Sequence, residues 1–166
     1  MAHASSVCLL ILTTKKYSFI FMLTNQLTIG LYLIAVLQLI YLSWTDIKSR
    51  IIGNRVIISL FFTMVALSWL KYEQVFVLQG AIGLAVCFIL FMLKVMGGGD
   101  AKLIAVLMLS IPPAQLISFF FLTAVFGLLL IIIGWLFFRQ SIKQKGLPYG
   151  VAISSGYLAT LWLFAS

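Results

Sequence analysis

Apolar runs separated by short polar segments divide most of the chain. Several of these runs approach the roughly 20 residues that an α-helix needs to cross a bilayer. We expect spans at residues 27–43, 56–70, 75–93, 103–111, 114–138 and 150–165. The fourth run is short and ends at Pro112-Pro113, because adjacent prolines remove helix donors and clash with the preceding turn. The pattern predicts an all-α, polytopic membrane protein with about six transmembrane helices.

Residues 1–26 do not fit this pattern. Lys15 and Lys16 interrupt the apolar residues, and each would cost about 2.5–3.5 kcal/mol in mid-bilayer. The charges follow the first apolar stretch, which is not the order found in a signal peptide. We expect an interfacial or poorly ordered N-terminal extension, followed by a membrane-embedded domain of residues 27–166. Translation starting at Met22 is an alternative.

The composition agrees with a membrane protein. Hydrophobic residues make up 64% of the chain, and the mean hydropathy is +1.22. The net charge is +8, but the cations fall between apolar runs, so the phospholipid bilayer rather than nucleic acid is the expected partner. A single histidine, His3, and two isolated cysteines, Cys8 and Cys87, predict neither a metal site nor a disulfide framework. No cofactor is expected.

The cations are distributed unevenly between the two sides of the predicted membrane protein. One side, with loops at 45–55, 94–102 and 139–145, holds eight of them: Lys48, Arg50, Arg55, Lys94, Lys102, Arg139, Lys143 and Lys145. The other side holds Lys71 and at most Lys15 and Lys16. Cytoplasmic loops carry the excess of Lys and Arg, so the first side is predicted to face the cytoplasm. Asp46 and Asp100 both fall there.

These two acids are the candidate catalytic residues. The third acid of the chain, Glu73, is expected on the opposite side. A carboxylate near a bilayer is costly and marks a functional-site candidate. Two carboxylates close together in a partly dry site share a proton, which provides a base to activate water and an acid to protonate a leaving group. With His3 as the single histidine, no Ser/His or Cys/His arrangement competes with an aspartate dyad.

A structural interpretation of the same residues stays open at this stage. The glycines at 97–99 would end the third helix, Asp100 would cap the fourth, and Asp46 would pair with Arg50 at i,i+4. The protein would then be a non-catalytic membrane subunit or a small transporter, with the aspartates as helix caps. A transporter, however, tends to place its acids near the bilayer midplane, whereas these are expected at helix ends.

The segment MGGGDAK at residues 96–102 resembles the GxGD motif of membrane-embedded aspartyl proteases. The lysine two residues after the aspartate is similar to the prepilin peptidase (type IV leader peptidase) branch. Upstream, Asp46, Ile52 and Asn54 resemble the D-x5-I-P-N pattern of that family, with Gly53 where the family usually has proline.

Near the C-terminus, Pro148-Tyr149-Gly150 is similar to the start of the last span in short members of the same family. The larger members N-methylate the new amino terminus and carry an insert with paired CxxC motifs, to which nothing here corresponds. We therefore expect no methyltransferase activity, and the size resembles the peptidases of Flp/Tad-type pilus systems.

The resemblance implies an aspartic endopeptidase of the bacterial inner membrane with its active site facing the cytoplasm. It would remove the basic leader peptide from prepilins or pilin-like proteins, with Asp46 and Asp100 as catalytic residues and no metal, and pilus assembly machinery is a further expected partner. The supporting motif residues are Gly97, Gly98, Gly99, Lys102, Ile52 and Asn54. A presenilin-type protease that cuts within membrane helices fits the short loops and the upstream pattern less well.

Overall fold

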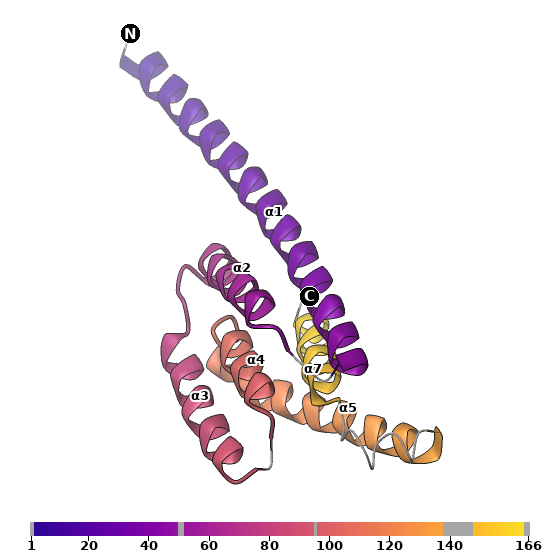
Figure 1. The fold of residues 1–166 in the computed structure, drawn as a ribbon. Helices are drawn as coiled ribbons and strands as arrows, with labels where there is room; N and C mark the ends of the chain where they lie inside the picture. The colour runs from indigo at the N-terminus through magenta and orange to yellow at the C-terminus, as the bar shows by residue number, and fades with distance from the viewer. Residues whose placement is uncertain (1, 50–51, 95, 138–147, 165–166) are drawn as a thin grey trace.

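The computed structural model describes residues 2–49, 52–94, 96–137 and 148–164 (Figure 1). These residues form the helices α1 (Ala2–Ser49), α2 (Asn54–Tyr72), α3 (Val77–Met92), α4 (Gly98–Met108), the 3-10 turn η1 (Pro113–Gln115), α5 (Leu116–Phe137) and α7 (Tyr149–Leu163). No strand occurs among them, which confirms the all-α prediction. By length and composition, the segments Met22–Ser49, Asn54–Tyr72 and Pro113–Leu136 can cross a membrane, and Val77–Met92 is a shorter apolar helix.

Helix α1 is continuous through two places where the sequence predicts a change. It includes most of the N-terminal extension, and its first half projects beyond the other helices in Figure 1. It also continues to Ser49, whereas the pattern predicts a loop from residue 45. No glycine or proline lies between Gly30 and Gly53, so this part of the sequence contains no residue that would stop the helix at residue 45. Asp46 therefore belongs to the last turns of a helix and not to a loop.

Helix α4 lies in the middle of the helices, with α2, α3 and α7 packed around it (Figure 1). Its buried residues are Ala101 and the unbroken run from Leu103 to Met108. Eleven residues give a helix of about 16 Å, roughly half the thickness of the hydrocarbon core. Because the other helices cover it, α4 needs neither the length nor the lipid-facing surface of a full span, which explains the short fourth apolar run.

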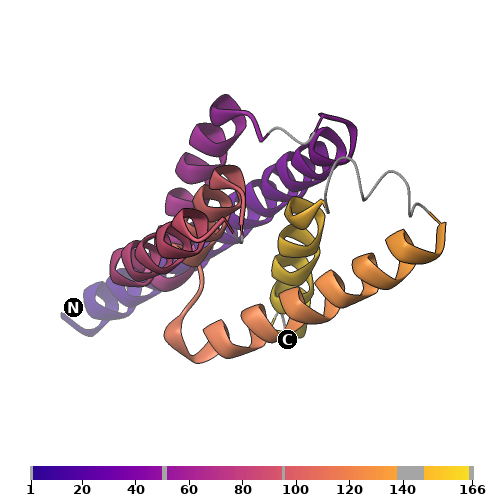
Figure 2. The same cartoon turned by 60° about the horizontal axis from the view of Figure 1, so that its bottom comes forward.

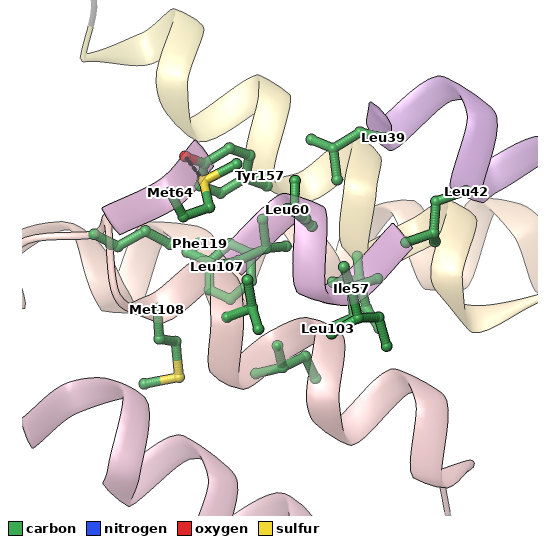
Figure 3. Packing of buried hydrophobic residues seen from close by; sticks show 14 of the residues in the cluster. Leu39, Leu42, Ile57, Leu60, Met64, Leu103, Leu107, Met108, Phe119 and Tyr157 are labelled. Atoms are coloured by element: carbon green, nitrogen blue, oxygen red, sulfur yellow. Dashed lines mark hydrogen bonds between the residues drawn. The ribbon is translucent and has the colours of Figure 1, made fainter. Parts of the chain in front are cut away.

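The core around α4 is formed by regular stripes on its neighbours. Buried residues recur every three or four positions, so each helix turns one face inward. On α1 they are Ala35, Leu39 and Leu42, and on α2 they are Ile57, Leu60, Met64 and Leu67. Figure 3 shows members of both stripes packed against Leu103 and Leu107 of α4.

A buried polar contact ties three helices together at the end of α4. The Tyr157 hydroxyl lies 2.8 Å from Ser110 Oγ and donates a hydrogen bond to Met64 Sδ at 3.2 Å. Figure 3 shows the tyrosine beside this methionine. Tyr157 is fully buried, so the hydroxyl would be costly without these partners. The contact fixes α7 against α2 at the end of α4 far from Asp100.

Helices α5 and α7 cross closely, and a glycine makes this possible (Figure 2). A Cβ on Gly156 of α7 would lie 2.7 Å from the Cα and 2.8 Å from the backbone N of Thr123 on α5. Small residues allow this kind of backbone approach between membrane helices. The crossing keeps the start of α7 in place beside the end of α1.

We predict that Gly156→Ala lowers the free energy of unfolding by about 1–3 kcal/mol, because the added methyl group pushes α5 and α7 apart. Thermal unfolding in detergent micelles measures the loss. Gly30→Ala on α1 is the matched control, since no atom lies within 4 Å of its added Cβ, and its stability should be unchanged or slightly higher. Equal stability of the two variants would contradict the predicted clash.

Candidate active site

Asp46 is directed into the protein by the face of α1 on which it lies. It follows Leu42 by four residues and Leu39 by seven, so it continues the buried stripe of that helix. Its side chain is 6% exposed. Within the bundle, the last turns of α1 therefore bring a carboxylate to the edge of the core.

The start of α7 meets this carboxylate. The backbone N–H of Gly150 donates a hydrogen bond to Asp46 Oδ2 at 2.9 Å. A Cβ on Gly150 would lie 2.8 Å from the same oxygen, so a glycine is required for this approach. Free N–H groups and the helix dipole make a helix N-terminus a favourable place for a negative charge. The first turn of α7 thus holds the acid that α1 supplies.

Asp100 lies at the start of α4, inside its first turn. Gly97 is the N-cap residue, so the capping position expected for Asp100 belongs to the glycine, and Asp100 is the third helical residue. Its carboxylate accepts a hydrogen bond from the Gly97 backbone N–H. This is the reach-back contact that acidic residues make at the third position of a helix.

The two carboxylates influence one another. Burial and the negative charge of Asp46 raise the pKa of Asp100 to about 6, and the hydrogen bond from Gly97 offsets part of this increase. Asp100 stands at a helix start outside the candidate membrane spans. A carboxyl with this pKa can hold a proton at mildly acidic pH and release it near neutrality.

The glycines of the motif permit close packing around Asp100. A Cβ on Gly99 would lie 3.0 Å from the Cβ of Ile52, and one on Gly98 would lie 3.3 Å from the ring of Phe91. The first contact brings the upstream motif and the glycine motif together. A larger residue at position 99 would separate the segment after α1 from the start of α4, and one at position 98 would press against α3.

A hydrogen bond links the same two motifs on the exposed side. Lys102 Nζ of α4 donates to Asn54 Oδ1 at the start of α2, at 3.1 Å. All eight residues that the sequence singles out thus gather where α1 ends and where α2 and α4 begin. Within the described ranges, no group of three or more His, Cys, Asp or Glu side chains comes together.

Cations surround this end of the bundle. Lys48, Arg55, Lys94 and Lys102 lie at the end of α1, the start of α2, the end of α3 and the start of α4. The other predicted members of the group, Arg50, Arg139, Lys143 and Lys145, lie outside the described residues, as does the expected pairing of Asp46 with Arg50. Lys71, at the far end of α2, lies over the rings of Tyr32 and Tyr72.

The comparison with protein families decides the identity. A model described as the type IV leader peptidase family matches residues 31–132, which are 102 of the 166 residues and include Asp46 and Asp100. The chain belongs to the type IV leader peptidase family. No curated protein and no solved structure gives a significant match. The resemblance inferred from the two motifs is therefore confirmed.

Gly150 contacts the candidate catalytic residue Asp46, and the sequence does not predict this contact. It lies outside the matched residues, and its hydrogen bond joins positions 104 residues apart. The available signal was Pro148 just before the last helix and a glycine in its first turn. Proline is common at helix starts, so the pattern alone predicts a helix start and not a contact with Asp46.

We predict that Asp100→Asn raises the thermal stability of this leader peptidase at pH 7–8. The folded protein binds a proton on Asp100 more readily than the unfolded chain, so stability falls as pH rises from about 4 through 6. Asparagine removes that charge. The difference in melting temperature between the variant and the parent protein should shrink as pH is lowered toward 4, because Asp100 of the parent then becomes neutral. Melting temperatures of both proteins across this range test the prediction. Glu73→Gln, at an exposed acid, is the control for loss of one charge.

A second prediction concerns Gly53, which stands where the family usually has proline. Its φ of −66° is the value that a proline ring imposes, and nothing lies within 4 Å of an added Cβ. Gly53→Pro should therefore stabilise the protein by about 0.4–1 kcal/mol, because proline reduces the conformational entropy of the unfolded chain. Chemical denaturation in detergent measures the gain, and a loss of stability would show that the loop before α2 needs the glycine.

Proposed function

We propose that this leader peptidase is an aspartic endopeptidase that removes the basic leader from prepilins or pilin-like proteins at the cytoplasmic face of the bacterial inner membrane. The observation that carries the proposal is the interaction of Asp46 and Asp100, which come from separate helices and whose charges affect each other at one end of the bundle. If the two acids were purely structural, nothing would require their carboxylates to lie close enough to repel each other in a partly dehydrated site.

The different surroundings of the two acids suggest their roles. Asp46, against the first turn of α7, suits the ionised base that removes a proton from water. Asp100 suits the protonated acid: it donates its proton to the scissile carbonyl oxygen, recovers it from the hydroxyl of the intermediate as the carbonyl re-forms, and donates it to the leaving amide nitrogen. The water oxygen bonds to the carbonyl carbon, the carbon–nitrogen bond breaks, and the proton taken by Asp46 restores the shared proton of the dyad.

The cation distribution supports the cytoplasmic orientation. The described cations nearest the dyad outnumber those at the opposite end of α2, as the positive-inside rule requires of a cytoplasmic face. On this proposal the protein acts in a pilus system of the Flp/Tad type, without a methyltransferase activity.

The rival interpretation, a non-catalytic membrane subunit with capping aspartates, has one observation in its favour. Each carboxylate accepts a hydrogen bond from the first residues of a helix or its cap. Capping alone, however, works best with the acids apart, because two nearby negative charges oppose each other. Catalysis gives a reason for bringing both to one place.

The test is co-expression with a prepilin-like protein that carries a basic leader ahead of an apolar helix. We predict that Asp46→Asn or Asp100→Asn lowers leader removal at least about 100-fold, because each removes an acid–base group. Asparagine keeps an oxygen that can accept the backbone hydrogen bond, so both variants should insert normally. Mass spectrometry of the substrate measures cleavage.

Glu73→Gln is the control for this experiment and should process the substrate like the parent protein. It changes an acid at the opposite end of α2, away from the dyad. Complete leader removal by either aspartate variant would show that the two acids are structural and would favour the non-catalytic subunit.

A further inference from the structure

An apolar cavity of about 730 Å³ lies between α3 and α5, with α4 and α7 at its base. Ile104 and Met108 of α4 belong to its lining, and so do Ala152 and Ile153 of α7. The α5 side of the lining extends from residue 116 to residue 131, which is about 22 Å along a helix. This length suits several turns of a helix better than a small molecule.

The cavity is open along its side and is therefore a groove. Val86 on α3 and Phe120 and Leu128 on α5 belong to its lining and are 52%, 45% and 58% exposed. Small residues, Gly83, Gly127 and Ala124 among them, also contribute. Small side chains let a neighbouring helix approach closely in a membrane.

One end of the groove is formed by residues adjacent to the dyad. Met96 immediately precedes Gly97, whose N–H binds Asp100. Tyr149 immediately precedes Gly150, whose N–H binds Asp46. A helix lying in the groove would thus end next to both carboxylates.

We propose that the groove between α3 and α5 binds the apolar helix of the substrate and presents the bond at its cytoplasmic end to the dyad. This rests on the proposed function, which requires a substrate whose cleaved bond precedes an apolar helix. The occupant is a single helix, because the lining is long, apolar and open at the side, as in other helix-in-groove complexes. A lipid chain would also fit the apolar lining, but it would not explain why the groove ends at residues 96 and 149, beside the two aspartates.

Two neighbouring positions on α5 give a matched test. Ala124 lines the groove, whereas Val125 is exposed on α5 outside it. Ala124→Trp should lower kcat/KM for the full helix-bearing substrate at least 10-fold, and Val125→Trp should leave it within about twofold. Cleavage of a short soluble peptide, which spans the same bond but lacks the apolar helix, should be unaffected by either change.

The outcomes separate the groove from the dyad. If the parent protein cleaves neither substrate, the proposed function fails. If it cleaves the full substrate and Ala124→Trp does so equally well, the groove proposal is wrong while the peptidase assignment stands. If Ala124→Trp loses both substrates, the fold is disturbed and a binding measurement decides.

That measurement is cross-linking in the inactive Asp100→Asn background, with Cys8 and Cys87 replaced by Ser. Leu128→Cys places a thiol in the groove, and Leu129→Cys places one on α5 outside it. Single cysteines along the substrate helix should form disulfides with position 128, recurring every three or four residues, and not with position 129. Equal cross-linking at both positions, or none at 128, would overturn the proposal.

Discussion

The arrangement depends on one constraint, the position of a carboxylate at the first turn of a short helix that is otherwise buried. Helix α4 satisfies its own backbone hydrogen bonds and packs its side chains on its neighbours, so it can lie inside the protein without crossing the bilayer. The first turn of α4 lies at the end of the bundle where α1 ends and α2 begins, and Pro112 follows the other end of α4. Asp100 is consequently close enough to the core to be partly dehydrated and close enough to the surface to exchange protons. A longer or shorter α4 would lose one of these properties.

Two helix starts meet at this place, and each holds one acid. The first turn of α7 binds Asp46, and the cap of α4 binds Asp100. These backbone donors offset part of the free energy that burial and mutual repulsion of the carboxylates would cost. The compensation is incomplete, as the raised pKa of Asp100 shows. Asp100 therefore holds a proton more readily than an exposed aspartate, because the fold makes a second full negative charge beside Asp46 unfavourable.

Part of this could be predicted from the sequence, and the limits have physical causes. Hydropathy and loop cations are local properties, so they predict an all-α membrane protein and place Asp46 and Asp100 on one side. Hydropathy does not distinguish a helix facing lipid from one facing protein, so it leaves α4 as a short span and does not show that it is central. The polar residues from position 45 onward predict a loop, but none of them is a helix breaker, so α1 continues to Ser49. The role of Gly150 depends on a contact with α1 that no local pattern contains.

Helix α4 also connects the dyad to the groove. Ile104 and Met108 form part of the groove's base, and Asp100 stands on the same helix closer to its start. If a substrate helix packs along this base, apolar contacts fix how far it extends toward the carboxylates, and the cleaved bond is selected by its distance from the end of the apolar segment. Recognition of this kind needs few polar groups in the protein, because the boundary between the apolar helix and the leader supplies the reference point. A chain with three acids and 64% hydrophobic residues can in this way select one peptide bond.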